Sequence, residues 1–321
     1  MTVGSFLGQL LFRPAWTADQ LPDLSGQVAF VAGGCTGLGH SAAKHLALRG
    51  ASVTVVAPDV ASGESVVAAL HNDSDQQSHG FVVASAVDLR SLSAAADEFL
   101  KTHSKLNILI NADSISSHQF SLSEQGIEQT FHTNHFAPML LTHKLLPLLE
   151  ASQPSRIVNL TSMTHMIVLN SIDYQYFDVP EMFDENTRYN ESKLAAIHFT
   201  RELQDRLETK YALLNKPCNI YVNCVHPGAI KDDHPTGDRD LKHILLDSVK
   251  VNVEKGVITP LYAAAAPEIE TMNIKGKYLV PYCTVAEPSL IAQDKETCVK
   301  TWQWSEYVFR HYFEPDFEMG I

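Results

Sequence analysis

The stretch VAGGCTGLGH occupies residues 31–40 and lies between an apolar run and a helix-like pattern. Its glycines Gly33, Gly37 and Gly39 have the spacing G-x-x-x-G-x-G. Glycine permits a tight turn and lets the backbone approach a ligand without a Cβ in the way. A helix that begins near Leu38 would direct its free N–H groups and its positive dipole end at a phosphate. The stretch predicts a dinucleotide-binding turn; the alternative is a glycine-rich turn without a ligand.

Short apolar runs alternate with longer helix-like stretches on either side of this turn. Continuous apolar runs are typical of strands that are buried on both faces, as in a parallel sheet. The alternation predicts a single-domain Rossmann-type α/β fold, with a doubly wound parallel sheet and helices on both faces. The expected strands are 28–31, 52–56, 81–86, 107–110, 156–160 and 219–225. The expected helices include 38–48, 92–103, 134–149 and 192–210.

The whole chain is interpreted as one catalytic domain with two flanking segments. An N-terminal arm covers residues 1–23, the dinucleotide-binding core covers 24–285, and an aromatic-rich extension covers 286–321. We expect the extension to dock as a helix on the body or on a dimer partner, and a lid over the substrate is the alternative. Candidate substrate loops follow two strands, at 163–188 and 231–240.

Composition and charge exclude several classes of protein. The formal net charge of −13 disfavours nucleic acid and anionic membranes as partners. The five cysteines are odd in number and match no zinc motif, so we expect reduced thiols, a cytoplasmic protein and no metal site. The apolar residues of the arm are too few to span a bilayer, and indicate packing or a weak peripheral membrane contact.

The stretch RYNESKLAAIHFTREL, residues 188–203, places Tyr189 and Lys193 four residues apart, on one face of the expected helix. A free tyrosine has a pKa of about 10 and is a poor acid or base near neutrality. A neighbouring ammonium stabilises the phenolate and lowers that pKa. We therefore expect Tyr189 to exchange protons with a substrate, while Lys193 also holds a ribose. For an isolated motif of this spacing, the alternative is an ordinary surface pair.

Polar residues also lie where ligands bind in such folds, at the carboxyl ends of strands. Thr161 and Ser162 end the fifth strand and could donate to a substrate oxygen or cap the strand end. Asn134 lies in an apolar helix, where it could bend the helix and hold a proton-relaying water. Asp88 could meet the adenine edge of a dinucleotide or cap a helix.

Together these motifs resemble the short-chain dehydrogenase/reductase family over residues 24–283. The sequence motifs are most similar to those of the retinol-dehydrogenase-like and WW-domain-oxidoreductase-like branch, which many reductases of secondary metabolism share. The motifs that carry the resemblance are Asn134-His135, RIVNLTS, YNESKLA, FTREL and VHPG. The resemblance implies an oxidoreductase with a catalytic tetrad of Asn134, Ser162, Tyr189 and Lys193.

The resemblance also implies a role for each of these residues. Tyr189 is the acid/base, Lys193 tunes it and binds ribose, and Ser162 polarises the carbonyl. Asn134 anchors the relay water, and the turn at Pro227 and Gly228 lies over nicotinamide. The expected cofactor contacts are Gly33, Gly37, Leu38, Gly39, Asp59, Asp88, Asn111, Tyr189, Lys193, Pro227 and Gly228.

Four positions depart from the family pattern. Ala32 replaces a threonine, and Asn111-Ala112-Asp113-Ser114 replaces N-N-A-G after the fourth strand. Asp113 would then lie near the phosphate and ribose side of the cofactor. Asp232 stands where a threonine often helps to hold the carboxamide. Pro58 stands where the branch often carries the arginine that clamps a 2′-phosphate; the branch still favours NADP, with NAD as the alternative.

We predict an NAD(P)H-dependent oxidoreductase that transfers hydride between nicotinamide and a carbonyl or secondary alcohol of a lipophilic small molecule. Secondary-metabolite biosynthesis is the expected setting, and apolar residues within 163–169 suit a lipophilic substrate. The resemblance implies a homo-oligomer that pairs through the two long helices. One alternative is a dinucleotide-binding sensor or interaction protein without turnover. Another is a cofactor-bound scaffold that catalyses cyclisation or isomerisation.

Overall fold

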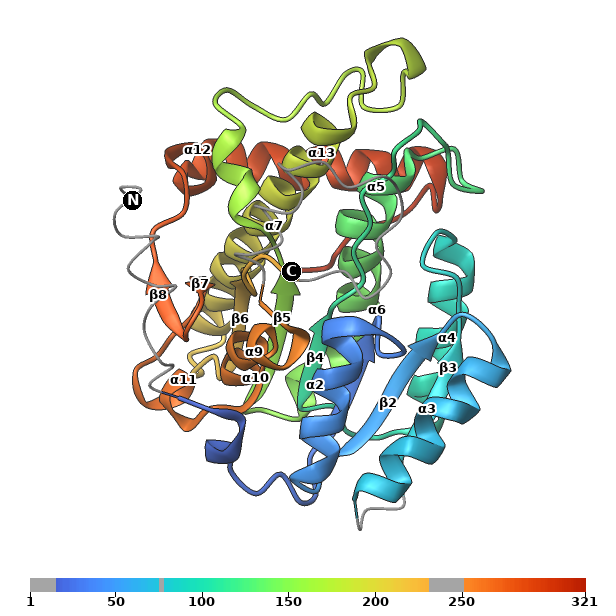
Figure 1. The fold of residues 1–321 in the computed structure, drawn as a ribbon. Coiled ribbons are helices and arrows are strands. Elements are labelled where there is room, and N and C mark those ends of the chain that lie inside the picture. The colour runs from blue at the N-terminus through green and yellow to red at the C-terminus, as the bar shows by residue number, and fades with distance from the viewer. Residues whose placement is uncertain (1–15, 75–77, 231–250) are drawn as a thin grey trace.

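An eight-stranded sheet forms the centre of this computed structural model, which describes residues 16–74, 78–230 and 251–321 (Figure 1). The strand order is β3-β2-β1-β4-β5-β6-β7-β8; the first seven strands are parallel, and β8 is antiparallel to β7. The strands are β1 (Val28–Ala32), β2 (Ser52–Ala57), β3 (Gly80–Val83), β4 (Ile108–Asn111), β5 (Ser155–Leu160), β6 (Ile220–Val225), β7 (Tyr278–Val280) and β8 (Thr284–Ala286). The predicted Rossmann-type fold is confirmed, and its strand order reverses between β1 and β4, where such folds bind ligands.

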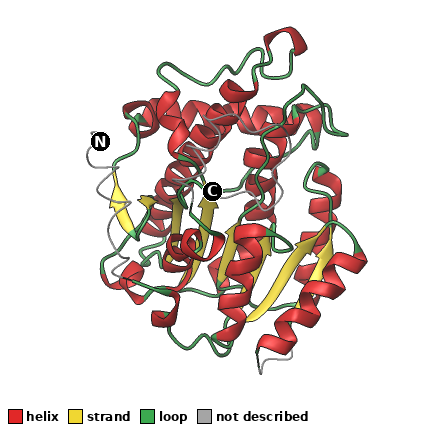
Figure 2. Ribbon diagram, in the orientation of Figure 1, coloured by secondary structure: helices red, strands yellow, loops and turns green. Residues whose placement is uncertain are grey.

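Helices form a layer on each face of the sheet (Figure 2). One layer contains α2, α3 and α10, and the other contains α4, α6, α7 and α13. The helices are α2 (Gly37–Leu48), α3 (Val60–Asp73), α4 (Leu89–Thr102), α5 (Gln129–Phe131), α6 (Ala137–Ala151), α7 (Glu185–Leu213), α9 (Val253–Gly256), α10 (Ile258–Ala265), α11 (Pro267–Thr271), α12 (Leu290–Gln293) and α13 (Lys295–Tyr312). Shorter helical turns are η1 (Ala18–Gln20), η2 (His132–Phe136), η3 (Met163–Ile167) and η4 (Pro180–Met182).

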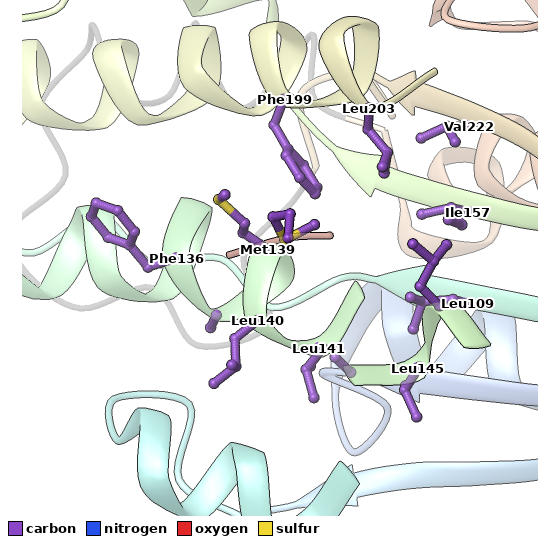
Figure 3. Close-up of a cluster of buried hydrophobic side chains, with 14 of the residues drawn as sticks. Leu109, Phe136, Met139, Leu140, Leu141, Leu145, Ile157, Phe199, Leu203 and Val222 are labelled. Carbon is purple, nitrogen blue, oxygen red and sulfur yellow. The ribbon is translucent and has the colours of Figure 1, made fainter. Parts of the chain in front are cut away.

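Two apolar cores result, because successive strand residues face opposite sides of the sheet. In β1, Phe30 packs into the core beneath α4 and α6, whereas Ala29 and Val31 pack beneath α2 and α10. Figure 3 shows the first core, in which side chains of α6 and α7 meet those of β4, β5 and β6. Each fully buried large aliphatic or aromatic side chain contributes about 1.5–3 kcal/mol. Every residue of β5 and β6 is buried. The polar residues Asn159 and Asn223 interrupt the apolar pattern, and their amides donate to Thr200 and to the Ile274 carbonyl.

The predicted third strand, 81–86, is too long at its end. The strand stops at Val83. Ala84 N–H makes the last bond to β2, at the Ala57 carbonyl (2.9 Å), and Ser85 N–H bonds to Ser91 on α4 instead. Asp88 caps the next helix, so α4 begins at residue 89 rather than at the expected residue 92. The strands β7 and β8 were not predicted, since three residues are too few to show a period.

The aromatic-rich C-terminal extension docks on the body through α13, as the sequence indicated. Trp302 is only 2% exposed, and the guanidinium carbon of Arg206 on α7 lies 4.5 Å from its ring centroid. Trp304 lies 5.3 Å from Phe136 between ring centroids. None of the helices in the described ranges is both long enough and apolar enough to cross a membrane.

Candidate active site

The glycine turn joins β1 to α2 at the carboxyl edge of the sheet (Figure 1). A Cβ on Gly39 would lie 2.1 Å from the Gly33 carbonyl oxygen, so no larger residue fits there. Gly37 has a φ of +52°, a conformation that favours glycine. No described atom lies within 4 Å of the position that its Cβ would take, so the turn is open on that side.

The N-terminus of α2 differs from those of the two following helices. Asp59 caps α3 by accepting from Ser62 N–H, and Asp88 caps α4 by accepting from Arg90 N–H. At α2, among the described residues, the Thr36 side chain makes no capping bond. The first N–H groups of a helix have no intrahelical partner, and they point along its positive dipole end. The open turn and this uncapped helix fit the pyrophosphate of a dinucleotide.

Two of the expected cofactor contacts therefore have a local structural role. The Asp59 carboxylate is exposed, and hydrogen bonds from Ser62 lower its pKa. The Asp88 carboxylate also accepts from the Gln125 amide at 2.7 Å. Both carboxylates cap helices, and the predicted cofactor contacts of the two residues stay predictions.

Asn111, at the end of β4, directs its side chain into the protein. Its amide donates to Asn159 Oδ1 at 2.8 Å, and the amide of Asn159 donates to Thr200 on α7 at 2.9 Å. These bonds tie β4, β5 and α7 together beneath the site. The side chain of Asn111 belongs to this buried network, and the predicted cofactor contact at this residue stays a prediction.

Asp113 lies against the glycine turn, two residues beyond β4. A Cβ on Gly33 would be 2.8 Å from the Asp113 backbone nitrogen and 2.9 Å from its Oδ1 atom. Burial raises the pKa of Asp113 to about 6, although a hydrogen bond with the Gly33 backbone opposes the rise. The structure thus places a carboxyl group beside the turn that fits a pyrophosphate.

Tyr189 and Lys193 lie on one face of α7, as predicted. Asp184 caps this helix by accepting from Thr187 N–H at 2.8 Å. The Lys193 amine lies 5.4 Å from the centroid of the Tyr189 ring, and Lys193 is only 1% exposed. Burial lowers the pKa of Lys193 to about 7.

The expected lowering of the Tyr189 pKa is not found. Burial raises this pKa, because a phenolate loses more hydration than a phenol. Hydrogen bonds from the hydroxyls of Ser114 and Ser162 oppose the rise. Burial also lowers the pKa of the Lys193 amine, which weakens any stabilisation of the phenolate by its charge.

Ser162 and Thr161 have separate roles at the end of β5. The Ser162 oxygen accepts from Thr164 N–H at 3.2 Å, which leaves its O–H free to donate. The Thr161 hydroxyl donates to the Lys193 carbonyl at 2.7 Å and so joins β5 to α7. Of these two residues, only Ser162 contacts the Tyr189 phenol.

Asn134 occupies the middle of the π-helical turn η2, so the helix is irregular there as the sequence suggested. Its side chain accepts from Ile115 N–H and donates to the Ile115 carbonyl, both at 2.8 Å. It also donates to Ser192 Oγ on α7 at 3.0 Å. Asn134 therefore holds the loop after β4 against α7; π-helical turns are frequent at functional sites.

The VHPG turn follows β6 at the same edge of the sheet. Gly228 has a φ of +94°, and Pro227 and Gly228 are partly exposed. Asp232 and the candidate loop 231–240 lie outside the described residues. The other candidate loop begins with η3 and carries exposed apolar side chains, with Ile167 66% and Leu169 84% exposed.

Two residues near the site were not assigned roles from the sequence. His165 donates from Nδ1 to the Ser162 carbonyl at 2.6 Å and accepts at Nε2 from Ser289 N–H at 3.2 Å. Ser114 contacts Tyr189. The only sequence signal for Ser114 was a serine in place of the usual glycine after the fourth strand.

Comparisons with known proteins agree with this architecture. The family model described as short chain dehydrogenase matches residues 27–174. Retinol dehydrogenase 12 of Mus musculus is 31% identical over 291 residues, which cover 90% of this chain and 87% of that protein. The chloroplastic short-chain dehydrogenase TIC 32 B of Brassica napus is 31% identical over 319 residues, which cover 93% and 94%.

Solved structures share the fold. An uncharacterized protein from Mycobacterium Paratuberculosis is 26% identical, with a TM-score of 0.72 over 93% of this chain and 98% of that one. A blue fluorescent protein from a metagenomic library, in complex with NADPH, is 21% identical, with a TM-score of 0.62 over 81% and 97%. From its relatives and its fold, this chain belongs to the short-chain dehydrogenase/reductase family, in the retinol-dehydrogenase-like branch, and is an NAD(P)-dependent oxidoreductase.

Proposed function

We propose that this chain reduces a carbonyl group, or oxidises the corresponding alcohol, with Tyr189 as its acid/base. One observation carries the proposal. The phenol of Tyr189 contacts the Ser162 hydroxyl and lies beside the buried amine of Lys193, at the sheet edge that carries the glycine turn. A proton donor, a second hydroxyl donor and an amine are the groups that carbonyl reduction needs beside a nicotinamide.

Each residue has a separate task in this proposal. The nicotinamide supplies the hydride when it is bound. Tyr189 gives its proton to the substrate oxygen, and Ser162, whose own oxygen is already engaged by Thr164 N–H, donates a hydrogen bond to that oxygen. Lys193 stabilises the resulting phenolate when it is charged and donates to ribose hydroxyls. Asn134 keeps the loop after β4 in place and anchors a relay water.

The proposed substrate is a lipophilic small molecule, with secondary metabolism as the setting. The name of the mouse relative supports this class, because retinol is a lipophilic alcohol. Ile167 and Leu169 offer apolar surface in the loop that follows Ser162.

A cytoplasmic location and a homo-oligomer stay predictions. The helix α13 covers part of α7, which is one of the two helices expected to pair.

The test uses the full chain with NADPH or NADH and a panel of lipophilic ketones and aldehydes. Loss of the nicotinamide absorbance on addition of a carbonyl compound would support the proposal. Tight cofactor binding without turnover of any substrate would favour a sensor or interaction protein. Rearranged product without consumption of the cofactor would favour a cyclase or isomerase.

We propose NADPH as the preferred cofactor, and expect the preference over NADH to be small. The family resemblance implies NADPH, and one structural neighbour is in complex with NADPH. The turn after β2 disfavours NADPH for two reasons. Residues 57–61 contain no lysine or arginine, and the exposed Asp59 carboxylate would repel a 2′-phosphate.

Pro58→Arg is expected to raise the ratio of kcat/KM for NADPH to that for NADH by about tenfold, since a charged hydrogen bond contributes about 1.5 kcal/mol or more. Pro58→Gln, which removes the ring without adding charge, is the matched control. Initial rates with both cofactors measure the ratio. An unchanged ratio in Pro58→Arg would mean that the adenosine phosphate lies away from this turn.

A further inference from the structure

A small cavity lies beside the candidate active site, between the ends of β4 and β5, the turn η2 and the helices α6 and α7. Its volume is about 10 Å³, which is about the room that one water molecule needs. The lining residues are Asn111, Asp113, Asn134, His135, Pro138, Asn159, Leu160, Ala196 and Phe199. All of them are buried except Asp113, which is partly exposed, so a molecule bound there would contact mainly interior side chains.

The orientation of the Asn111 amide follows from a chain of hydrogen bonds. The Thr200 hydroxyl donates to the Ala196 carbonyl at 2.8 Å, so it accepts from the amide of Asn159 at 2.9 Å. The side-chain oxygen of Asn159 therefore faces Asn111, and it accepts from the Asn111 amide at 2.8 Å. This leaves Asn111 Oδ1 as an acceptor, and that atom is buried without a partner among the described residues.

The position of the proton on His135 follows from similar reasoning. The Ser305 hydroxyl donates to the Thr301 carbonyl at 2.7 Å, so its 2.6 Å bond with His135 needs a proton on Nε2. Burial lowers the pKa of His135 to about 3, so the ring is neutral and carries only that proton. Nδ1 is therefore a second acceptor, and it too is buried without a partner in the described part of the chain.

Two acceptors that line one cavity cannot bond to each other, and a buried acceptor without a donor is costly. A water molecule has two O–H groups to donate and matches the volume. We propose that the cavity binds one water molecule, which donates hydrogen bonds to Asn111 Oδ1 and to His135 Nδ1. Lys193 is not among the described residues that line the cavity, so this water is separate from the relay water that Asn134 anchors in the proposed function.

The water connects the end of β4 with the turn η2. His135 follows Asn134 in that turn, and both of its ring nitrogens are then engaged, one by Ser305 of α13 and the other by the water. The C-terminal helix and β4 are thus joined through the residue next to Asn134. This inference goes beyond the proposed function and does not depend on hydride transfer, since it concerns the interior of the folded chain.

A high-resolution crystal structure of the full chain is the direct test. We expect one peak of density within hydrogen-bonding distance of both Asn111 Oδ1 and His135 Nδ1. A cavity without such a peak, or a direct hydrogen bond between His135 and Asn111, would overturn the proposal.

NMR of the full chain with ¹⁵N-labelled histidine tests the proton positions independently, with the His135 signals assigned through backbone correlations. We expect a neutral ring from about pH 5 to about pH 8, with its proton on Nε2. A proton on Nδ1 would contradict the proposal, because this nitrogen could then donate to Asn111 without a water.

Two variants of Ala196, which lines the cavity, form a matched pair. Ala196→Val fills the cavity and should expel the water, whereas Ala196→Gly enlarges the cavity and should retain the water. With methyl-labelled leucine, a cross-peak between Leu160 and a long-lived water should be present in the wild type and in Ala196→Gly, and lost in Ala196→Val. A cross-peak that is missing from the wild type, or that survives in Ala196→Val, would show that this cavity does not hold the water. If Ala196→Val does not fold, the wild-type crystal structure still decides.

Discussion

Tyr189→Phe is expected to lower kcat by about 1,000-fold, because general acid catalysis by one side chain contributes about 10²–10⁴-fold. The substitution removes a single oxygen and keeps the ring, which lies beside the Lys193 amine. Cofactor affinity should therefore change by less than about threefold, since the ring still fills its place. Stopped-flow measurement of cofactor oxidation, with fluorescence titration of the cofactor, separates the two quantities.

A matched control is Tyr211→Phe, which removes a phenol near the other end of α7 that accepts from the Gln153 amide at 2.5 Å. Its kcat should stay within about twofold of the wild type. Turnover that survives in Tyr189→Phe would end the proposal for this residue, whatever the cofactor affinity. Equal losses in both variants would indicate general damage to the fold.

The direction of the Tyr189 pKa shift adds a pH dependence. Because burial raises this pKa, the proton donor persists through neutral pH. We expect the rate of carbonyl reduction to be flat through neutrality and to fall only in alkali, where the phenol ionises. Alcohol oxidation needs the phenolate and should rise over that alkaline range. Initial rates of carbonyl reduction and of alcohol oxidation, each measured as a function of pH, test these two expectations.

The glycine turn and the Tyr189–Lys193 pair were predictable because their information is local. The spacing G-x-x-x-G-x-G specifies a turn that α2 must follow, and a separation of four residues places two side chains on one helical face. The fold class was also predictable, since β1 and β2 are mainly apolar and buried along most of their length, as strands covered on both faces are. These features depend on neighbours within a few residues.

The remainder of the site depends on contacts between distant segments. Asn134 holds Ile115, 19 residues away, and Ser192, 58 residues away. His165 meets Ser289 across 124 residues. No spacing rule predicts such pairs. The sign of the Tyr189 pKa shift was wrong for a related reason, because the sequence shows a charged neighbour but does not show how deeply the pair is buried.

The other large effect concerns the carboxyl group that Asp113 places beside the glycine turn. Its pKa is raised to about 6, so it is neutral in weak acid and a carboxylate above that pH. A carboxylate next to a bound pyrophosphate is repelled, at a cost of about 2 kcal/mol for two charges some 7 Å apart in a partly buried site. Cofactor binding should therefore weaken about 30-fold as the pH rises from about 5 to about 8.

Asp113→Ala should remove this pH dependence and bind the cofactor about 30-fold more tightly at about pH 8. Asp113→Asn is the matched control, because it retains the shape and one hydrogen-bond acceptor without the charge. Calorimetric titrations in buffers with different ionisation enthalpies supply a further observable. Near neutral pH the wild type should take up a proton on binding, since the phosphates raise the pKa of Asp113 further, and Asp113→Asn should not.

The opposite result would also have a definite meaning. If Asp113→Ala and Asp113→Asn bind the cofactor more weakly, the carboxylate accepts hydrogen bonds from ribose hydroxyls and stabilises the complex. Affinity in the wild type would then rise, not fall, as the pH passes about 6. The sign of the pH dependence therefore decides whether the replacement of N-N-A-G by Asn111-Ala112-Asp113-Ser114 opposes the cofactor or helps to hold it.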